Sequence, residues 1–379
     1  MNSKKICVLG AAGAIGSRLV TLLHQQNFEV TAVVRSWSSA VRIGRFDIPI
    51  VSLDLLTTSV ESLADVINSH DIVIDCTCSG NGDYDQRVAE SLHMAETICT
   101  AAIKVNVKRL IHYSTVSVYP VNANKVDETV DCVESGDSYG DSKLAAERFF
   151  LKQSKTDLSV TVLQLPIVFG PFMGWSTFPV AQMLGQELVM PEGLKGWCAP
   201  LFVDDVVHAT ILAFDCKGSY GERILLSDKS MSWYEYFSAY TKHAGSLSLS
   251  SLAREKFIER EKKAAHSLKP FQKIKSKFIN DGDFRQLILS QWGIRSIYAL
   301  VKQSRGQEGI DQIKQKIESS VEPRQTQVLL SENNVQLFDS LPEVNANKAK
   351  EVLGMNNYTS FDDAMLSTYD WLKWARLIN

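Results

Sequence analysis

Apolar runs alternate with stretches of helical spacing through the first half of the chain. Runs rich in Val, Ile and Leu predict strands, while apolar residues three and four positions apart, such as Ile15, Leu19 and Leu22, predict helices. Strands are predicted within 5–10, 29–35, 48–55, 70–78, 108–115 and 160–169, and helices within 14–26, 59–67 and 84–105. This alternation predicts an α/β fold, a doubly wound parallel sheet with helices on both faces.

The composition is that of a water-soluble globular protein. Of the 379 residues, 45% are hydrophobic and 22% are charged, and the formal net charge of −3 gives no reason to expect a nucleic-acid partner. No apolar run approaches the ~20 residues that a membrane span needs. Seven scattered cysteines without a C-x-x-C pair favour reduced thiols over disulfides or a metal site. We therefore expect a cytoplasmic protein without a metal.

A glycine-rich turn follows the first predicted strand. Gly10, Gly13 and Gly16 are spaced as G-x-x-G-x-x-G, and Ala14 and Ile15 begin the helix after them. Glycine allows a tight turn and lets a pyrophosphate approach the helix N-terminus closely. The position between a strand and a helix predicts a dinucleotide-binding loop rather than a plain turn.

The end of the second predicted strand bears on the choice of cofactor. An NAD site usually has an acidic residue there, whereas an arginine accommodates the 2′-phosphate of NADP. This strand ends in Arg35 and Ser36 without an acid, which favours NADP(H) over NAD(H), although a solvated strand end would look the same. Asp54 and Leu55, after the third strand, fit either an adenine contact or a simple turn.

Tyr139 and Lys143 stand four residues apart in the segment DSYGDSKLAAERFF, residues 137–150. Residues at this spacing share one face of a helix. Taken alone, the segment fits an ordinary amphipathic helix as well as a catalytic pair.

The order of motifs along the chain resembles the extended short-chain dehydrogenase/reductase family. The resemblance runs from Lys5 to about Phe214, with a weaker similarity at the C-terminus. It rests on the glycine loop, STVSVY at 114–119, YGDSK at 139–143, PIVFGP at 166–171 and LFVDDVVHATILAF at 201–214. It implies a Rossmann domain and NAD(P)-dependent chemistry in which Thr115, Tyr139 and Lys143 are catalytic.

The resemblance also implies a role for each catalytic residue. Thr115 would hydrogen-bond the substrate oxygen, and Tyr139 would exchange the hydroxyl proton while hydride moves to or from the nicotinamide. Lys143 would bind the nicotinamide ribose and favour the phenolate. Cofactor-binding residues are predicted to be Gly10, Gly13, Ala14, Ile15, Gly16, Arg35, Ser36, Asp54, Leu55, Cys76, Tyr139, Lys143, Pro166 and Val168.

Departures from the family motifs narrow the substrate. Sugar dehydratases carry an Asp-Glu pair where Val116-Ser117 stand, and sugar-nucleotide enzymes often have an asparagine where Ile167 stands. The arginine that they tend to carry ahead of VDD is missing from residues 197–202. We therefore expect a less charged, more apolar or carrier-tethered small-molecule substrate. The substrate residues are predicted to be Ser117, Ile167, Phe172, Trp175 and Phe178, although such aromatic residues also suit a plain core.

Two parts of the chain are predicted. Residues 1–171, completed by about 201–228, would form the Rossmann domain, and 172–200 with 229–379 a smaller, mostly helical substrate-binding part. An insertion is expected at about 246–342. It contains a basic helical segment, around 252–279, which fits a solvated face, a lid, a carrier-protein contact or a membrane-surface helix.

Three functions are consistent with these features. The favoured one is an NADP(H)-dependent oxidoreductase acting on a carbonyl or secondary alcohol. The alternatives are an epimerase with tightly bound NAD(P), acting on a sugar nucleotide or a related metabolite, and a non-catalytic cofactor-binding sensor. Because Tyr139 and Lys143 are both present, the sensor is disfavoured. A homodimer is left open.

Overall fold

The computed structural model describes residues 4–80, 82–121, 123–154, 158–242, 244–267 and 327–378. The described chain divides into two compact units. Unit 1 comprises Met1–Gln182, Leu194–Leu247 and Glu332–Asn379, and unit 2 comprises Met183–Gly193 and Ser248–Ser331. These bounds differ from those of the predicted domains, and the assignment of a substrate-binding part stays a prediction. Most of the expected insertion, including the second half of its basic segment, lies outside the described residues.

A seven-stranded parallel sheet forms the centre of unit 1, in the order β11-β7-β5-β4-β1-β2-β3. Its strands are β1 (Lys5–Leu9), β2 (Glu29–Val34), β3 (Ile50–Ser52), β4 (Ile72–Asp75), β5 (Arg109–Thr115), β7 (Ser159–Leu165) and β11 (Glu222–Leu225). The strand order reverses between β1 and β4, and in sheets of this kind ligands bind beyond the carboxyl ends at that point. The predicted doubly wound α/β fold is confirmed.

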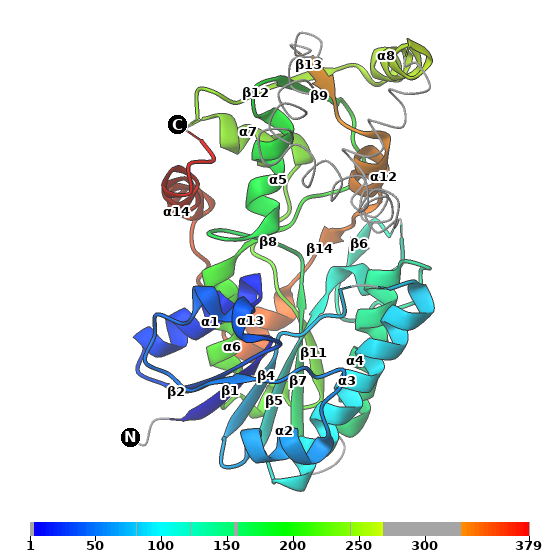
Figure 1. Ribbon diagram of the computed structural model, residues 1–379. Coiled ribbons are helices and arrows are strands. Elements are labelled where there is room, and N and C mark those ends of the chain that lie inside the picture. Colours follow the sequence, from blue (N-terminus) through cyan, green and yellow to red (C-terminus); the bar gives the residue numbers. More distant parts are fainter. Residues whose placement is uncertain are drawn as a thin grey trace, which may run out of the picture. The chain divides into compact units, whose positions relative to one another are not determined.

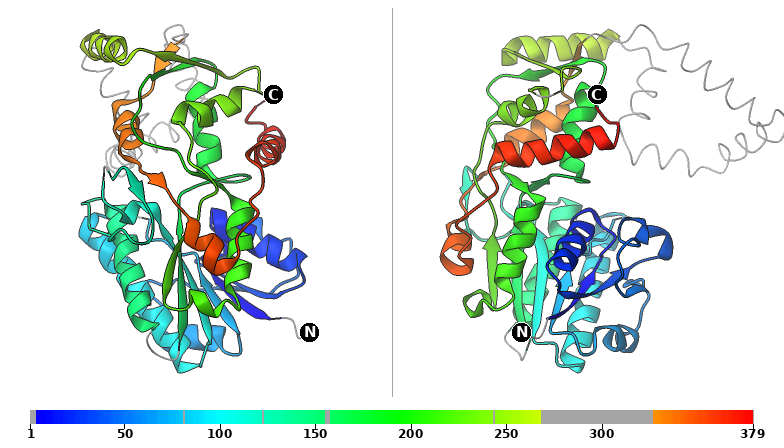
Figure 2. Two further views of the ribbon diagram at one scale, coloured as in Figure 1. Left: turned by 180° about the vertical axis from the view of Figure 1, so that it is seen from behind. Right: turned by 90° about the vertical axis from the view of Figure 1, so that its left-hand side faces the viewer.

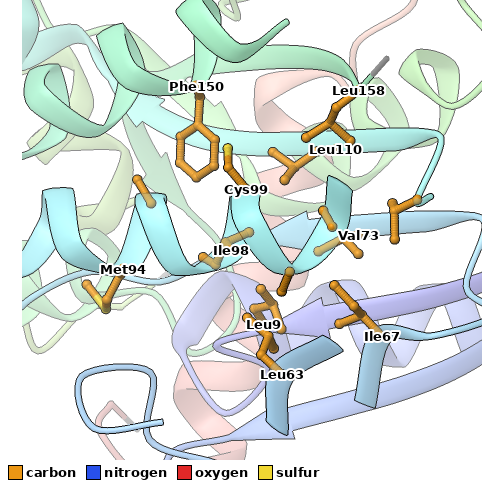
Figure 3. Packing of buried hydrophobic residues seen from close by; sticks show 14 of the residues in the cluster. Leu9, Leu63, Ile67, Val73, Met94, Ile98, Cys99, Leu110, Phe150 and Leu158 are labelled. Atoms are coloured by element: carbon orange, nitrogen blue, oxygen red, sulfur yellow. The ribbon is translucent and has the colours of Figure 1, made fainter. Parts of the chain in front are cut away.

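Helices cover both faces of the sheet (Figure 1). One face is covered by α1 (Ala14–Gln25), α6 (Val203–Ala213) and α13 (Asn347–Leu353), and the other by α2 (Val60–Ile67), α3 (Tyr84–Lys104) and α4 (Ser138–Gln153). Figure 3 shows the core under the second group, where Leu63, Ile98 and Phe150 from the helices meet Val73 and Leu110 from the strands. Burial of these side chains, each worth ~1.5–3 kcal/mol, holds the helices against the sheet.

The remaining elements of unit 1 are short strands and helices. β8 (Ile167–Phe169) pairs with β10 (Pro200–Phe202), and β6 (Lys125–Val126) with β14 (Glu343–Val344). Short 3₁₀ helices occur at η1 (Trp37–Arg42), η2 (Val116–Val118) and η3 (Lys217–Ser219). The helices are α5 (Gly174–Met183), α7 (Trp233–Thr241), α12 (Glu332–Ser340) and α14 (Phe361–Trp374). Helix α14 packs on α7, with the rings of Tyr369 and Tyr240 6.3 Å apart (Figure 2).

Unit 2 contains a small parallel sheet and one helix. Strand β9 (Glu187–Pro191) lies between β12 (Ser248–Leu252) and β13 (Gln327–Leu329), and α8 spans Arg254–Ser267. The first half of the predicted basic helix is therefore helical. No helix among the described residues is both long and apolar enough to cross a membrane.

Two strand predictions need correction. The single strand expected at 160–169 is broken at Pro166 into β7 and β8, which belong to different sheets. Proline has no N–H to donate, so a ladder cannot continue unchanged through it. Strand β11 was not predicted, because its sequence, ERIL, is short and begins with two charged residues.

Candidate active site

The glycine loop connects β1 to α1 with a backbone that side chains would obstruct. Gly10 has a φ of +72°, and a Cβ there would lie 3.0 Å from the backbone of Cys76, at the end of β4. A Cβ on Gly16 would lie 2.4 Å from the carbonyl oxygen of Gly10, so only glycine lets α1 begin this close to the loop. Gly13 is the N-cap of α1, whose first turn has no acidic residue. This geometry fits a loop that a diphosphate can approach closely, and its role in cofactor binding stays a prediction.

The residues expected near the adenosine half lie at the ends of β2 and β3. Arg35 is exposed and forms no ion pair with any described residue. Ser36 is the N-cap residue of η1, and its hydroxyl hydrogen-bonds that of Ser38. The Asp54 carboxylate accepts a hydrogen bond from the N–H of Leu56 within its own turn, and Leu55 is buried. These positions fit an adenosine phosphate, but their cofactor roles stay predictions.

Lys143 lies at the carboxyl ends of β4 and β5. Its side chain is buried, and Nζ donates to the carbonyl oxygens of Thr77, at 2.9 Å, and Tyr113, at 2.8 Å. An ammonium has three N–H donors, so one is left for a ligand. A buried ammonium held by two carbonyls is a rigid donor, which is what a ribose-binding lysine needs.

A buried acid–base pair fixes the loop that Lys143 contacts. Asp75 accepts from Thr77 through both the backbone N–H, at 2.9 Å, and the hydroxyl, at 2.6 Å, while His112 Nδ1 lies 2.7 Å from its other oxygen. Burial raises the pKa of Asp75, but His112 and the charge of Lys143 outweigh it, so the net pKa is lowered. Burial lowers the pKa of His112. The pair is therefore a carboxylate and a neutral imidazole close to Lys143.

Thr115 and Tyr139 are brought together by contact between η2 and α4. Thr115 ends β5, and its Oγ1 accepts from the N–H of Ser117 at 3.2 Å. Tyr139 is half-buried in the first turn of α4, which Asp137 caps by accepting from the N–H of Gly140 at 2.7 Å. A Cβ on Gly140 would lie 2.5 Å from the carbonyl oxygen of Ser117. The absence of a side chain at Gly140 thus lets α4, which carries Tyr139, begin this close to η2, the turn that follows Thr115.

The predicted substrate residues are divided among several environments. Ile167 is buried in β8, flanked by Pro166 and Val168. Phe172 adopts a left-handed backbone (φ +68°), and its ring lies 5.2 Å from that of Trp371. Trp175 and Phe178 pack in an aromatic cluster with Trp233, Phe237 and Phe338. The packing of Trp175 and Phe178 is what a plain hydrophobic core would show, and a contact of either ring with substrate stays a prediction.

Several polar residues around the site escaped the sequence reasoning. Glu147, one turn beyond Lys143, is buried and accepts from Ser114 at 2.5 Å and from Gln164 at 3.0 Å. Its spacing from Lys143 was the available signal, because residues at i and i+4 share a helix face. Arg87 of α3 lies over the ring of Tyr139, with Cζ 5.4 Å from the ring centroid. Nothing in the sequence relates Arg87 to Tyr139, which follows it by 52 positions.

Comparison with known proteins agrees with this geometry. Residues 6–224, more than half of the chain, match the NAD dependent epimerase/dehydratase family, and the chain belongs to that family. It is an NAD(P)-dependent enzyme of the extended short-chain dehydrogenase/reductase type.

Two curated relatives are cinnamoyl-CoA reductases. The chain is 24% identical to cinnamoyl-CoA reductase 1 of Petunia hybrida over 191 residues, which are 46% of this chain and 57% of that enzyme. It is 26% identical to cinnamoyl-CoA reductase 2 of Arabidopsis thaliana over 252 residues, which are 59% of this chain and 73% of that enzyme. The match thus spans little more than half the length of the petunia enzyme.

Solved structures share the fold over nearly the whole chain. The epimerase Mth375 of Methanothermobacter thermautotrophicus aligns with a TM-score of 0.67 and 15% identity, covering 99% of this chain and 94% of the other. UDP-glucuronic acid 4-epimerase of Bacillus cereus, in complex with UDP-glucuronic acid and NAD, aligns with a TM-score of 0.64 and 17% identity, covering 98% and 99%. At these identities the likeness establishes the fold alone.

Proposed function

We propose that the chain is an NADP(H)-dependent oxidoreductase that acts on a carbonyl or secondary alcohol of a relatively apolar or carrier-tethered substrate. The observation that carries the proposal is the grouping of Thr115, Tyr139 and Lys143 at the carboxyl ends of β4 and β5, with Lys143 fixed by two carbonyl oxygens. The glycine loop, at the end of the adjacent β1, would hold the diphosphate of the cofactor.

The residues have distinct tasks in this mechanism. The cofactor, when bound, supplies or accepts the hydride. Thr115 donates a hydrogen bond to the substrate oxygen, which orients the carbonyl carbon and stabilises charge on the oxygen as the reaction proceeds. Tyr139 gives the proton to that oxygen in reduction and removes it in oxidation. Lys143 uses its remaining N–H on the ribose and supplies positive charge close to the phenol.

NADP(H) is favoured over NAD(H) because Arg35 is an exposed cation without an ion-pair partner among the described residues, and no acid follows β2. The names of the curated relatives support a reductase that acts on a CoA thioester, so cinnamoyl-CoA is the first tethered substrate to test. Addition of a hydride to its thioester carbonyl and protonation of the oxygen by Tyr139 would give a thiohemiacetal, which loses the CoA thiol to leave an aldehyde.

An epimerase is the second candidate, favoured by the fold shared with UDP-sugar enzymes. Two features of the sequence disfavour an epimerase. Ile167 stands where sugar-nucleotide enzymes often have an asparagine that contacts the sugar nucleotide, and residues 197–202 contain no arginine. The two candidates differ in cofactor exchange. A reductase consumes NADPH stoichiometrically, whereas an epimerase retains its NAD(P) through purification and shows no net consumption.

The test is the Tyr139→Phe variant, assayed by NADPH absorbance with a panel of ketones, aldehydes and thioesters. Phenylalanine keeps the ring and removes only the hydroxyl, so turnover should fall ~100-fold or more, the scale of a general acid–base group. Cofactor affinity and unfolding should change little. Tyr234→Phe, which removes an exposed hydroxyl from α7, is the matched control. Wild-type turnover in Tyr139→Phe would refute the assignment.

A further inference from the structure

Helix α3 brings a cation to the predicted catalytic tyrosine. Arg87 lies in the first turns of α3, which runs beside α4 (Figures 1 and 2). Its Nε donates to the carbonyl oxygen of Ser79 at 3.1 Å, and its Nη1 lies 3.3 Å from the hydroxyl of Ser138. These bonds hold the guanidinium over the Tyr139 ring, with Cζ 5.4 Å from the centroid. Arg87 is thus a positioned, half-buried cation at the reacting end of the site.

Most of the hydrogen-bonding capacity of Arg87 is unused. A guanidinium has five N–H donors, and the two bonds to Ser79 and Ser138 leave three without a partner among the described residues. Arg109, a buried arginine of β5, differs, because all three of its nitrogens donate, to Ala213, Ser159, Thr161 and Ser219. Arg109 is bonded as a structural arginine should be, whereas Arg87 has donors to spare.

Three acidic residues near Arg87, one on α3 and two at the start of α4, have other partners. Glu90 accepts from Ser79 and Gln86, Asp137 caps α4, and Asp141 accepts from Tyr84 and from the N–H groups of Ser135 and Gly136. No described carboxylate forms an ion pair with Arg87. A half-buried cation without a counter-charge costs free energy, which a bound anion would recover.

We propose that Arg87 binds a carboxylate of the substrate beside the carbon that Tyr139 serves. The planar fork of a guanidinium matches the two oxygens of a carboxylate. The 5.4 Å between Cζ and the phenol ring allows one small molecule to touch both residues. The inference rests on the proposed function and narrows its substrate to otherwise apolar molecules that bear a free carboxylate, such as keto acids or hydroxy acids, in place of a tethered thioester. It also places the anion contact on α3, in a chain that lacks the arginine expected within 197–202.

Equilibrium binding tests the inference without turnover. The protein, saturated with NADP⁺ so that the cofactor site is filled, is titrated with three carboxylate–amide pairs of increasing reach: acetate and acetamide, benzoate and benzamide, cinnamate and cinnamamide. At least one carboxylate should bind about tenfold or more tighter than its amide, the scale of a charge-assisted hydrogen bond. Arg87→Gln should abolish this preference, and Arg87→Lys, which keeps the charge without the fork, should retain part of it.

A matched variant controls for the loss of charge. Arg148→Gln removes an exposed arginine of α4 that pairs with Glu134, and it should leave the preference unchanged. A preference that survives in Arg87→Gln, or that is absent from wild type in all three pairs, would overturn the inference. So would a tenfold loss of NADP⁺ affinity in Arg87→Gln, because Arg87 would then belong to the cofactor site. Failure of the proposed function is seen separately, as normal turnover in Tyr139→Phe.

Discussion

Replacing Gly140 by alanine should separate the predicted catalytic residues without unfolding the protein. The added Cβ would lie 2.5 Å from the carbonyl oxygen of Ser117, whereas ordinary contacts begin near 3.4 Å. The N-terminus of α4 and the η2 turn must therefore move apart by about 0.9 Å. Tyr139 moves with the helix and Thr115 with the turn. A misplacement of ~1 Å can cost ~100-fold in rate, and we expect a loss of turnover of that order.

The cost in stability should be smaller. Overpacking of this kind costs ~1–3 kcal/mol. Alanine in place of glycine recovers ~1 kcal/mol of helix propensity. The free energy of unfolding should therefore fall by only ~0–2 kcal/mol, an amount that leaves an ordinary domain folded. Cofactor affinity should fall only modestly. Lys143 lies one turn further along α4 and keeps its bonds to Thr77 and Tyr113 when the shift is confined to the start of the helix.

The assay compares Gly140→Ala with Gly218→Ala. A Cβ on Gly218 meets the side chain of Val352 at 3.6 Å, an ordinary contact, so the control adds the same methyl group without a clash. Turnover is followed by NADPH absorbance on a verified substrate, and stability by urea unfolding. Wild-type turnover in Gly140→Ala would refute the reasoning. A stability loss large enough to leave the variant unfolded under assay conditions would refute it as well.

Two further predictions concern the cofactor and the buried pair. Arg35→Ala should weaken NADP(H) binding by ~1.5–3 kcal/mol and leave NAD(H) unchanged, because only the 2′-phosphate contact is lost; equal wild-type affinities for both cofactors in a fluorescence titration would contradict it. Burial lowers the pKa of His112, so below about pH 6.5 the folded state binds fewer protons than the unfolded state, and stability should fall on acidification by up to ~1.4 kcal/mol per pH unit. His112→Gln keeps a hydrogen-bond donor for Asp75 and removes this titration. In urea unfolding between pH 7.5 and 5.5, the free energy of unfolding of the variant should therefore rise relative to that of wild type as the pH falls. A difference in unfolding free energy that does not change with pH would argue against the assignment.

The parts of the site that the sequence predicted consist of residues that lie close together in the sequence. The glycine loop lies within seven residues between a strand and a helix, and Tyr139 and Lys143 within one turn, so spacing alone relates their members. Strands buried on both faces, such as β1, form nearly continuous apolar runs and are equally visible. The break at Pro166 was missed because the apolar pattern continues across it, although β7 and β8 pair with different strands.

The parts that the sequence did not predict depend on packing between distant segments. Arg87 meets Tyr139 because α3 and α4 lie side by side, and His112 meets Asp75 because β5 pairs with β4. For Trp175 and Phe178 the sequence left a substrate pocket and a plain core both open. Their rings pack with those of α7 and α12, and a contact with substrate stays a prediction. Residue type cannot separate a pocket from a core, since both are lined by aromatic side chains.

On helix α4 the sequence spacing did carry a signal for a buried polar residue, Glu147, that was not predicted. Its face toward the sheet carries Tyr139, Lys143 and Glu147 at intervals of four residues, and the last two are buried. A lysine and a glutamate on a helix are ordinarily read as a solvated face. Here Lys143 bonds the carbonyls of Thr77 and Tyr113, and Glu147 bonds Ser114 and Gln164, so polar bonds attach the helix to the ends of three strands. Burial raises the pKa of Glu147, while its hydrogen bonds with Ser114 and Gln164 act in the opposite direction and replace its contacts with water. Since Ser114 precedes Thr115 directly, Glu147 also fixes the end of the strand that carries Thr115. The helix that carries Tyr139, the predicted proton donor, thereby helps to position the residue predicted to bind the substrate oxygen.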